Sequence, residues 1–189
     1  MHLMIDLETA GTTAGCRIYS IGAVLFDPRA GILGEKFYQE IDHASYEGTP
    51  FTVDPETTRW WESQGLTPPC GSTSIEQALR DFKAYACHHK PTWANSPSFD
   101  HNILRAAYSI IDAEPPQALH YPYEADLRTL RRLAGHDQPL NNCHTAVDDA
   151  INQAHVVIEC YRLLRLRPHD PDTETPQRIT QWRYQAPTM

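Results

Sequence analysis

The sequence contains no apolar run long enough to cross a membrane. None of its 189 residues lies in a stretch that approaches the roughly 18 consecutive apolar residues of a transmembrane helix. The first residues, Met1 to Asp6, show neither the basic segment nor the long apolar segment of a secretory signal peptide. Both absences argue against a membrane protein and against export.

Cysteine pairs with the spacing of a metal ribbon are also missing. The cysteines form an odd set without any Cys-x-x-Cys pair, and they are Cys16, Cys70, Cys87, Cys143 and Cys160. This pattern argues against a zinc ribbon and against a complete disulfide framework. We therefore expect a soluble, reduced, cytoplasmic protein.

Basic residues are in the minority. The chain has 16 Lys and Arg against 24 Asp and Glu, which gives a formal net charge of −8. Proteins that coat phosphate backbones without specificity are usually basic, because each neutralised phosphate releases counterions. Any nucleic-acid contact of this chain should therefore be local and mediated by metal.

The remaining composition is that of one compact domain. Hydrophobic residues make up 41% of the chain, enough for a sizeable core. We see no internal repeat and no internal linker, so we expect a single α/β domain over residues 1–164. Residues 165–189 are polar and contain three prolines before Ala186, which predicts an extended C-terminal arm.

Alternation predicts β-structure at the N-terminal end. Residues 3–8 alternate strictly, as in a strand with two different faces. One face carries Leu3, Ile5 and Leu7, and the other carries Met4, Asp6 and Glu8. Residues 17–27 and 35–41 flank a turn at 28–31 and are expected to complete an antiparallel meander.

Helical signals dominate the rest of the chain. Asp54 followed by Pro55 fits an N-cap with proline at the first helical position, and this helix carries Trp60 and Trp61. Further elements are expected in this order: a helix after a capping box of Ser74 and Gln77, a strand at 91–94, a helix at 98–112, a short helix from Asp126 to Gly135, and a helix from His144 or Thr145 onward.

Asp6 and Glu8 are the first candidate functional pair. Because they stand two apart on a strand, both carboxylates lie on one face, about 6–7 Å apart along the backbone. Such carboxylates repel each other unless a cation lies between them, and oxygen ligands favour magnesium or manganese. An exposed edge strand with a polar face is the alternative interpretation.

Further candidates stand at the starts of two expected helices. Asp100 lies where a strand ends, the place where sheets bind ligands, although it could also serve only the helix dipole. His144 and Asp149 are five apart, which puts them off a common helical face. We therefore place His144 in the preceding loop, free to reach a reacting water, and Asp149 in the first turns of the helix. Asp148 is expected to be a solvated acid.

The order of these segments resembles the three exonuclease motifs of the DEDDh branch of the DnaQ-like, ribonuclease-H-fold exonucleases. The matching segments are Asp6-Leu7-Glu8-Thr9, Asn95-Ser96-Pro97-Ser98-Phe99-Asp100 and His144-Thr145-Ala146-Val147-Asp148-Asp149. Within this family, Trp60-Trp61-Glu62-Ser63-Gln64 is similar to a helix of a phage and bacterial group of 3′→5′ exoribonucleases. Residues 126–129 are similar to a segment that follows the second motif in that group.

The resemblance implies a ribonuclease-H-like α/β fold with a mixed five-stranded sheet flanked by helices. It also implies that Asp6, Glu8, Asp100 and Asp149 bind two divalent cations, Mg²⁺ or Mn²⁺, and that His144 is the general base. The chemistry agrees, because two cations about 3.5–4 Å apart polarise a phosphodiester and stabilise the leaving oxygen. Histidine can take a proton from water near neutral pH.

Several side chains are candidates for substrate binding, namely Met4, Thr9, Asn95, Trp60, Trp61 and Phe99. Aromatic faces stack single-stranded bases with about 1–3 kcal/mol each. Adjacent tryptophans on a helix point about 100° apart, so at most one of the pair readily faces a cleft. Phe99 also suits the core. His88-His89 and Cys143 lack ligand spacing or a base partner, so zinc and nucleophile roles are disfavoured.

The expected reaction is stepwise release of nucleoside 5′-monophosphates from a single-stranded 3′ end. RNA is favoured over DNA by the resemblance alone, since no residue indicates a contact to the 2′-hydroxyl. A 3′→5′ exodeoxyribonuclease acting on single-stranded or frayed DNA is one alternative. A catalytically silent nucleic-acid-binding module is another. Family members of this size often self-associate, so a homodimer is possible.

Overall fold

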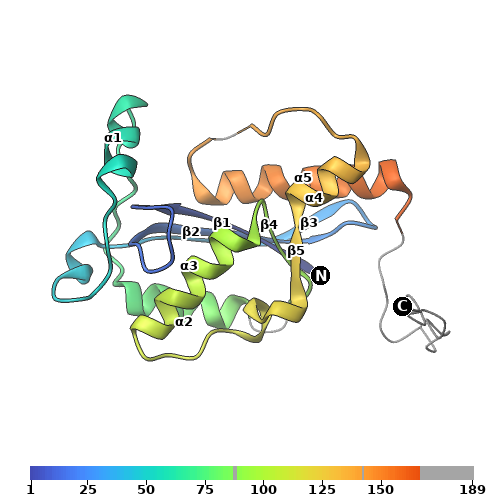
Figure 1. Ribbon diagram of the computed structural model, residues 1–189. Coiled ribbons are helices and arrows are strands. Elements are labelled where there is room, and N and C mark those ends of the chain that lie inside the picture. The colour runs from blue at the N-terminus through green and yellow to red at the C-terminus, as the bar shows by residue number, and fades with distance from the viewer. Residues whose placement is uncertain (87–88, 142, 167–189) are drawn as a thin grey trace, which may run out of the picture.

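The protein is built around one mixed β-sheet, with strand order β3-β2-β1-β4-β5 (Figure 1). The computed structural model describes residues 1–86, 89–141 and 143–166. The predicted mixed five-stranded sheet flanked by helices is confirmed. The arm predicted after residue 164 lies, from residue 167 onward, outside the described residues, and so do Cys87 and His88.

The sheet combines an antiparallel half with a parallel half. β1 (His2–Thr9) pairs antiparallel with β2 (Ile18–Asp27), which pairs antiparallel with β3 (Ile32–Glu40). β4 (Thr92–Ala94) and β5 (Glu124–Asp126) add to the other side of β1 in parallel. The N-terminal meander is therefore confirmed. The sequence pattern did not indicate β5, because its three half-buried residues show no alternation.

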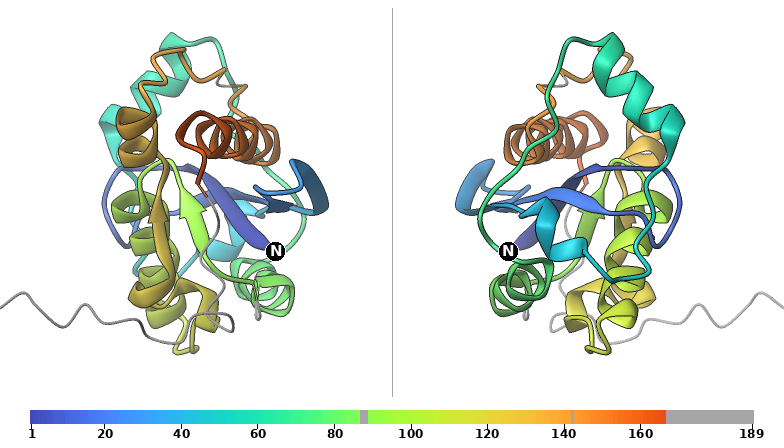
Figure 2. Two further views of the ribbon diagram at one scale, coloured as in Figure 1. Left: turned by 90° about the vertical axis from the view of Figure 1, so that its right-hand side faces the viewer. Right: turned by 90° about the vertical axis from the view of Figure 1, so that its left-hand side faces the viewer.

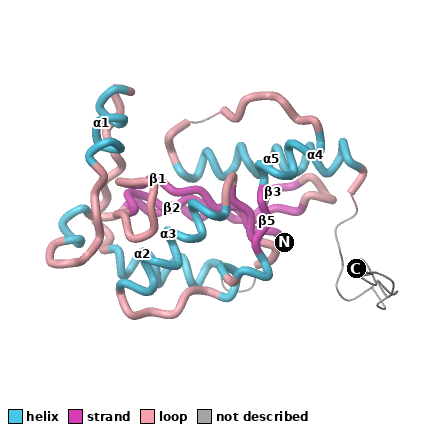
Figure 3. Tube along the Cα trace, viewed as in Figure 1, coloured by secondary structure: helices cyan, strands magenta, loops and turns pink. Residues whose placement is uncertain are grey.

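Helices cover both faces of the sheet (Figures 1 and 3). α5 (Ala146–Leu164) lies across β1 and β2, with α4 (Leu127–Ala134) beside it. α2 (Ile75–Ala86) and α3 (Pro97–Ile110) cover the opposite face. α1 (Pro55–Ser63) stands at one end of the sheet, outside both layers. The 3-10 turns are η1 (His43–Tyr46), η2 (Gln117–Leu119) and η3 (Tyr121–Tyr123).

The alternation of β1 divides the interior into two cores. Leu3, Ile5 and Leu7 belong to the core under α2 and α3. Met4 belongs to the core under α4 and α5. Because strand side chains alternate between faces, β1 fills both cores and still presents Asp6 and Glu8 on the α5 side.

The predicted helix starts are confirmed by their caps. Asp54 accepts a hydrogen bond from the Glu56 amide, and Asp126 accepts one from the Thr129 amide. Gly135 ends α4 with a φ of 63°, which a glycine adopts without the steric cost of a side chain. The capping box before α2 is only half formed: Ser74 accepts from the Gln77 amide, but the Gln77 side chain bonds to Asp81 instead.

Gly22 allows the first turn of α5 to lie directly against the sheet. It stands opposite Asp6 in the β1–β2 pair. A Cβ atom built at residue 22 would lie 2.1 Å from the Ala146 carbonyl carbon and 2.2 Å from the Val147 nitrogen. These are backbone atoms that cannot rotate away, so any side chain at this position forces α5 off β2.

No helix in the described part of the chain has both the length and the apolar character that a membrane span requires.

We predict that Gly22→Ala lowers the free energy of unfolding by about 1–3 kcal/mol, the usual cost of overpacking a well-packed interior. The measurement is the midpoint of urea unfolding at equilibrium. Gly34→Ala is the matched control, because the added Cβ would meet the flexible end of the Met1 side chain at 2.9 Å and Leu25 only at 3.2 Å or more. Equal midpoints for wild type and Gly22→Ala would contradict the close approach of α5.

Candidate active site

Four carboxyl groups from three elements converge at one end of the sheet. β1 supplies Asp6 and Glu8, the first turn of α3 supplies Asp100, and the first turn of α5 supplies Asp149. Asp149 interacts electrostatically with both carboxyl groups of β1, and Asp100 interacts with the same two groups. The structure thus brings together all four acids that the sequence singled out.

Burial dominates the electrostatics of these acids. It raises the pKa of Asp6 to about 7, and the negative charge of Asp149 adds to the effect. Burial, together with the charges of Asp6 and Asp149, raises the pKa of Glu8 to about 8. Burial and the charge of Asp6 also raise the pKa of Asp100 well above its usual range. Without a positive partner, the ionised set is unfavourable.

Asp149 also organises the loop in front of its own helix. Its two carboxylate oxygens accept hydrogen bonds from the backbone amides of Cys143 at 2.7 Å and of His144 at 3.0 Å. His144 adopts a φ of 56°, in the left-handed region that costs energy for a residue with a side chain. As expected, His144 lies in the loop and Asp149 in the first helical turn.

His144 lies beside the acids. One ligand atom from each of Glu8, His144 and Asp149 can be chosen so that all three lie within 4.8 Å of one another. The carboxylate oxygens of Glu8 and Asp149 are ligands that suit a divalent cation, and the imidazole of His144 lies beside them. The residues present therefore fit a metal ion, and the raised pKa values of Asp6 and Glu8 show why one would stabilise the ionised site.

Two tryptophans of α1 lie beside His144. The imidazole lies edge-on to Trp60, with ring centroids 5.2 Å apart, and edge-on to Trp61 at 6.5 Å. Trp61 is buried and its indole nitrogen donates to the Thr9 carbonyl, whereas 41% of Trp60 is exposed. Trp61 packs in the interior as expected for one of the pair, but both rings line the neighbouring cleft, so the prediction that at most one of them faces a cleft is wrong. Figure 2 shows α1 beside the loop that leads into α5.

A cleft of about 440 Å³ opens beside Glu8 and the tryptophans. The lining residues are Leu7, Glu8, Thr9, Gly11, Thr12, Asp54, Glu56, Thr57, Trp60, Trp61 and Phe99. Within the described residues the lining contains three carboxyl groups and neither lysine nor arginine. The cleft therefore favours neutral, hydroxyl-bearing or aromatic groups over free anions.

Most of the residues predicted to contact substrate line the cleft. Thr9, Trp60, Trp61 and Phe99 line the cleft, and Phe99 also packs against the core under α2 and α3. The prediction for Met4 is wrong, because this side chain is 0% exposed in the core under α5. The alternation places Met4 on the face of the two acids but two residues deeper along the strand.

Asn95 lies outside the cleft lining. It follows β4 directly, and its carbonyl accepts from the Arg128 amide at 3.3 Å. Its side-chain oxygen is buried and has no hydrogen-bond partner among the described residues. A role of Asn95 in substrate binding stays a prediction.

Two residues near the acids were not predicted from the sequence. Gln153 donates a hydrogen bond from Nε2 to Asp6 Oδ1 at 2.6 Å. Its spacing of four from Asp149, on one helical face, was the available signal. Gly22 gave no signal, because its importance comes from the approach of a helix more than 100 residues later in the chain. The cleft residues of the loop after β1 were also not foreseen.

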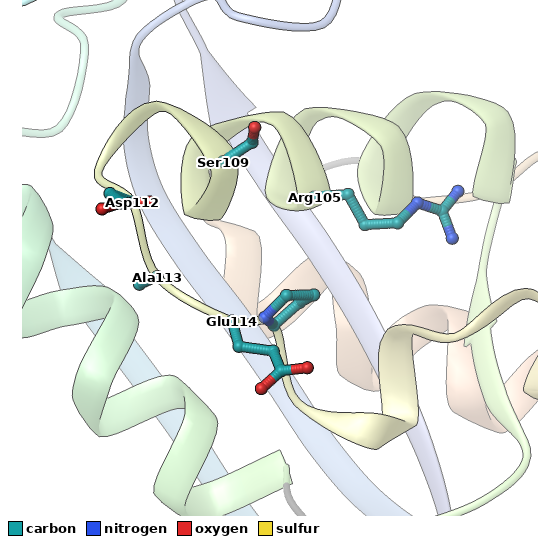
Figure 4. A pocket seen from close by; sticks show the side chains of 6 residues that line it. Arg105, Ser109, Asp112, Ala113 and Glu114 are labelled. Carbon is teal, nitrogen blue, oxygen red and sulfur yellow. The ribbon is translucent and has the colours of Figure 1, made fainter.

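A second hollow, of about 460 Å³, lies at the C-terminal end of α3 (Figure 4). It is lined by Arg105, Ser109, Asp112, Ala113, Glu114 and Pro115. Arg105, its cationic residue, already forms an ion pair with Glu124 and donates to the Leu119 carbonyl and to Asn102. With its cation committed to other residues, this hollow is a weaker candidate than the acidic site.

The raised pKa values predict how stability depends on pH in a chelator. The unfolded chain ionises both carboxyls near pH 4, whereas the folded protein keeps protons on Asp6 up to about pH 7 and on Glu8 up to about pH 8. Because the folded state then binds more protons, the free energy of unfolding should fall as pH rises from about 5 to about 8. Thermal unfolding at constant ionic strength measures this.

Glu8→Gln is the control for that experiment, since it removes one titrating group and should flatten the pH dependence. Manganese should restore stability at the alkaline end. A melting temperature that rises with pH over this range would contradict the burial of these acids.

The fold is shared with solved exonuclease structures. Exonuclease X in complex with 5′ overhanging duplex DNA is 16% identical, with a TM-score of 0.59 over 88% of this chain and 95% of that one. E. coli exonuclease I in complex with a dT13 oligonucleotide is 18% identical, with a TM-score of 0.57 over 88% of this chain and only 41% of that one. The nuclease domain of 3′hExo, a DEDDh family member bound to rAMP, is 13% identical, with a TM-score of 0.54 over 85% and 90%.

The sequence itself identifies the family. No curated protein matches the chain. The family model described as the 3′-5′ exoribonuclease Rv2179c-like domain matches residues 1–161, which include all four acids and His144. The solved structures at these identities show the ribonuclease-H-like fold, and the family match adds the sequence relationship. The chain therefore belongs to the Rv2179c-like 3′-5′ exoribonuclease domain family.

Proposed function

We propose that this protein is a metal-dependent exonuclease that releases nucleoside 5′-monophosphates from single-stranded 3′ ends, with RNA favoured over DNA. The observation that carries the proposal is the meeting of Glu8, His144 and Asp149, whose ligand atoms lie within 4.8 Å of one another beside the acidic cleft. Family membership supports the direction of hydrolysis, and the family description supports RNA.

Asp6, Glu8, Asp100 and Asp149 would hold two divalent cations, Mg²⁺ or Mn²⁺. Their oxygen atoms are the ligands these ions prefer, and burial makes the unpartnered ionised acids unfavourable. When bound, the cations supply Lewis acidity to the scissile phosphodiester and stabilise the leaving 3′ oxygen. The acids themselves contribute rigidity, because each comes from a helix or strand rather than from a mobile loop.

His144 would be the general base that accepts a proton from the attacking water. The amide of His144 is tied to Asp149, and the ring lies against the edges of Trp60 and Trp61. These contacts hold the imidazole beside the acids without a charged partner on the tryptophan side. A base held in this way is oriented before substrate arrives, which lowers the entropic cost of the step.

The cleft would bind the 3′-terminal nucleoside. Trp60 offers an exposed aromatic face for the base, and Thr9 and Phe99 line the same space. Trp61, anchored to the Thr9 carbonyl, would support this wall. Asn95, at the end of β4, would be a more distant contact. The acidic lining suits the hydroxyls of a terminal sugar, which can donate hydrogen bonds to carboxylates.

Two alternatives remain testable. A 3′→5′ exodeoxyribonuclease would use the same site, and the structural relatives include proteins crystallised with DNA. A catalytically silent binding module is disfavoured, because binding alone needs no histidine beside four acids.

We propose a cytoplasmic location. This is supported by the free thiols of the described cysteines, which are Cys16, Cys70, Cys143 and Cys160. Neither the structure nor the comparisons support a homodimer.

We predict that 5′-labelled single-stranded RNA is shortened from its 3′ end with manganese or magnesium and not with a chelator. His144→Ala should lower the turnover rate by about 10²- to 10⁴-fold, the usual contribution of a general base. Its affinity for manganese should change much less, because the acids remain. Denaturing gels measure the rate, and calorimetry measures the affinity.

His155→Ala is the matched control, since this exposed histidine lies on α5 outside the site and should leave the rate unchanged. Matched DNA run in parallel gives the preference between the two strands. Failure to cleave either strand with any metal would move the assignment to the silent module. An equal loss of metal binding and turnover in His144→Ala would count against its role as the base.

We also predict that a terminal 3′-phosphate slows degradation about tenfold or more relative to a 3′-hydroxyl, because like charges brought together cost free energy. The cleft lining has carboxyl groups at Glu8, Asp54 and Glu56 and no lysine or arginine among its described residues. Initial rates on the same RNA with and without the phosphate measure the effect. Glu56→Gln should reduce the difference, and equal rates in wild type would contradict an acidic terminal site.

A further inference from the structure

Gln153 touches a proposed metal ligand from the core side. It lies on α5 one turn after Asp149, on the face that packs against β1 and β2, and only 4% of it is exposed. Its Nε2 donates to Asp6 Oδ1 at 2.6 Å, a short contact for a nitrogen donor. Asp6 therefore has one oxygen engaged by a buried amide of the helix that also carries Asp149.

The orientation of this amide follows from chemistry. When Asp6 is ionised, as a metal ligand has to be, its oxygens can only accept, so the amide nitrogen faces Asp6 and the amide oxygen faces away. That oxygen, Oε1, is buried and has no hydrogen-bond partner among the described residues. The neighbouring residues Ala154 and Val157 on the same helix belong to the core under α4 and α5. An apolar side chain would fill this place without an unpaired oxygen.

A residue that serves only packing would not leave a buried oxygen unpaired beside an acid. We propose that Gln153 is a positioning residue of the metal site, which holds the Asp6 carboxylate in the orientation that binds the cation. This inference rests on the proposed function, since it takes Asp6 to be a metal ligand. Partners that hold a metal ligand from behind fix its rotation and tune its affinity.

The backbone geometry makes this role possible. Asp149 and Gln153 are four residues apart, so they lie on the same face of one rigid helix. Gly22, opposite Asp6 on β2, lets that face reach the sheet. α5 thus carries Asp149, which is a proposed metal ligand, and also Gln153, which positions a second proposed ligand, Asp6. The relative position of the two carboxyl groups is therefore set by α5 and not only by the side-chain rotamers of Asp6 and Asp149.

The test is Gln153→Met in the full-length protein, which keeps the length of the side chain and removes the donor. Manganese affinity measured by calorimetry should fall about 10- to 100-fold, the usual effect of removing such a partner. The rate kcat should fall while KM for RNA changes little, because the cleft is untouched. The urea midpoint in a chelator should be unchanged or higher, since a buried unpaired oxygen is removed.

Gln77→Met is the matched control, the same substitution at an exposed position of α2, and should leave all three quantities unchanged. Gln153→Leu is the second variant: it also removes the donor and places a branched apolar side chain there, so it should weaken manganese binding to a similar extent. If Gln153→Met fails to fold, Gln153→Leu decides the question by the same measurements.

Asp6→Asn distinguishes a failure of the proposed function from a failure of the positioning role of Gln153. If wild type binds no manganese and cleaves nothing, the proposed function itself is wrong. If wild type binds manganese, Asp6→Asn does not, and Gln153→Met binds as tightly as wild type, the positioning role alone is overturned. A loss of affinity in Gln153→Met that is matched by a comparable loss of stability in the chelator would also overturn it, because it would mark a purely structural residue.

Discussion

The contact between the first turn of α5 and the centre of the sheet is the constraint on which the site depends. Gly22 permits it, because a side chain there would meet the backbone of Ala146 and Val147. Through this contact a helix near the end of the chain brings Asp149 and Gln153 to the acids of β1, which lie more than 140 residues earlier. Helix and strand are rigid elements, so the contact fixes relative positions that flexible side chains alone could not maintain.

The same packing gives the site its electrostatic character. Asp6, Glu8 and Asp100 are held where burial opposes ionisation, and Asp149 adds a further negative group. A divalent cation reverses this balance, since it favours the ionised form of every ligand. The net charge of −8 does not conflict with binding of a polyanion, because part of the negative charge lies at the place where the cations would be held.

Asp149 connects the acids with the remaining functional groups. Its carboxylate accepts from the amides of Cys143 and His144, so the loop that carries the histidine is anchored to a proposed metal ligand. On the other side, the imidazole meets Trp60 and Trp61, and Trp61 is tied to the end of β1 through Thr9. Acids, histidine and cleft wall are therefore joined by a continuous set of contacts.

The sequence by itself determined the local structure and the identity of the chemical groups. Strict alternation identified β1 and the shared face of Asp6 and Glu8, and the caps at Asp54 and Asp126 marked helix starts, because these signals depend on neighbours in the chain. Tertiary structure decided the rest. Met4 shares the face of the acids but is sealed under α5, Gln153 gains its partner only across the interior, and Gly22 matters only because a distant helix approaches it. Such contacts between elements far apart in the chain leave no local pattern, since they depend on where rigid elements meet.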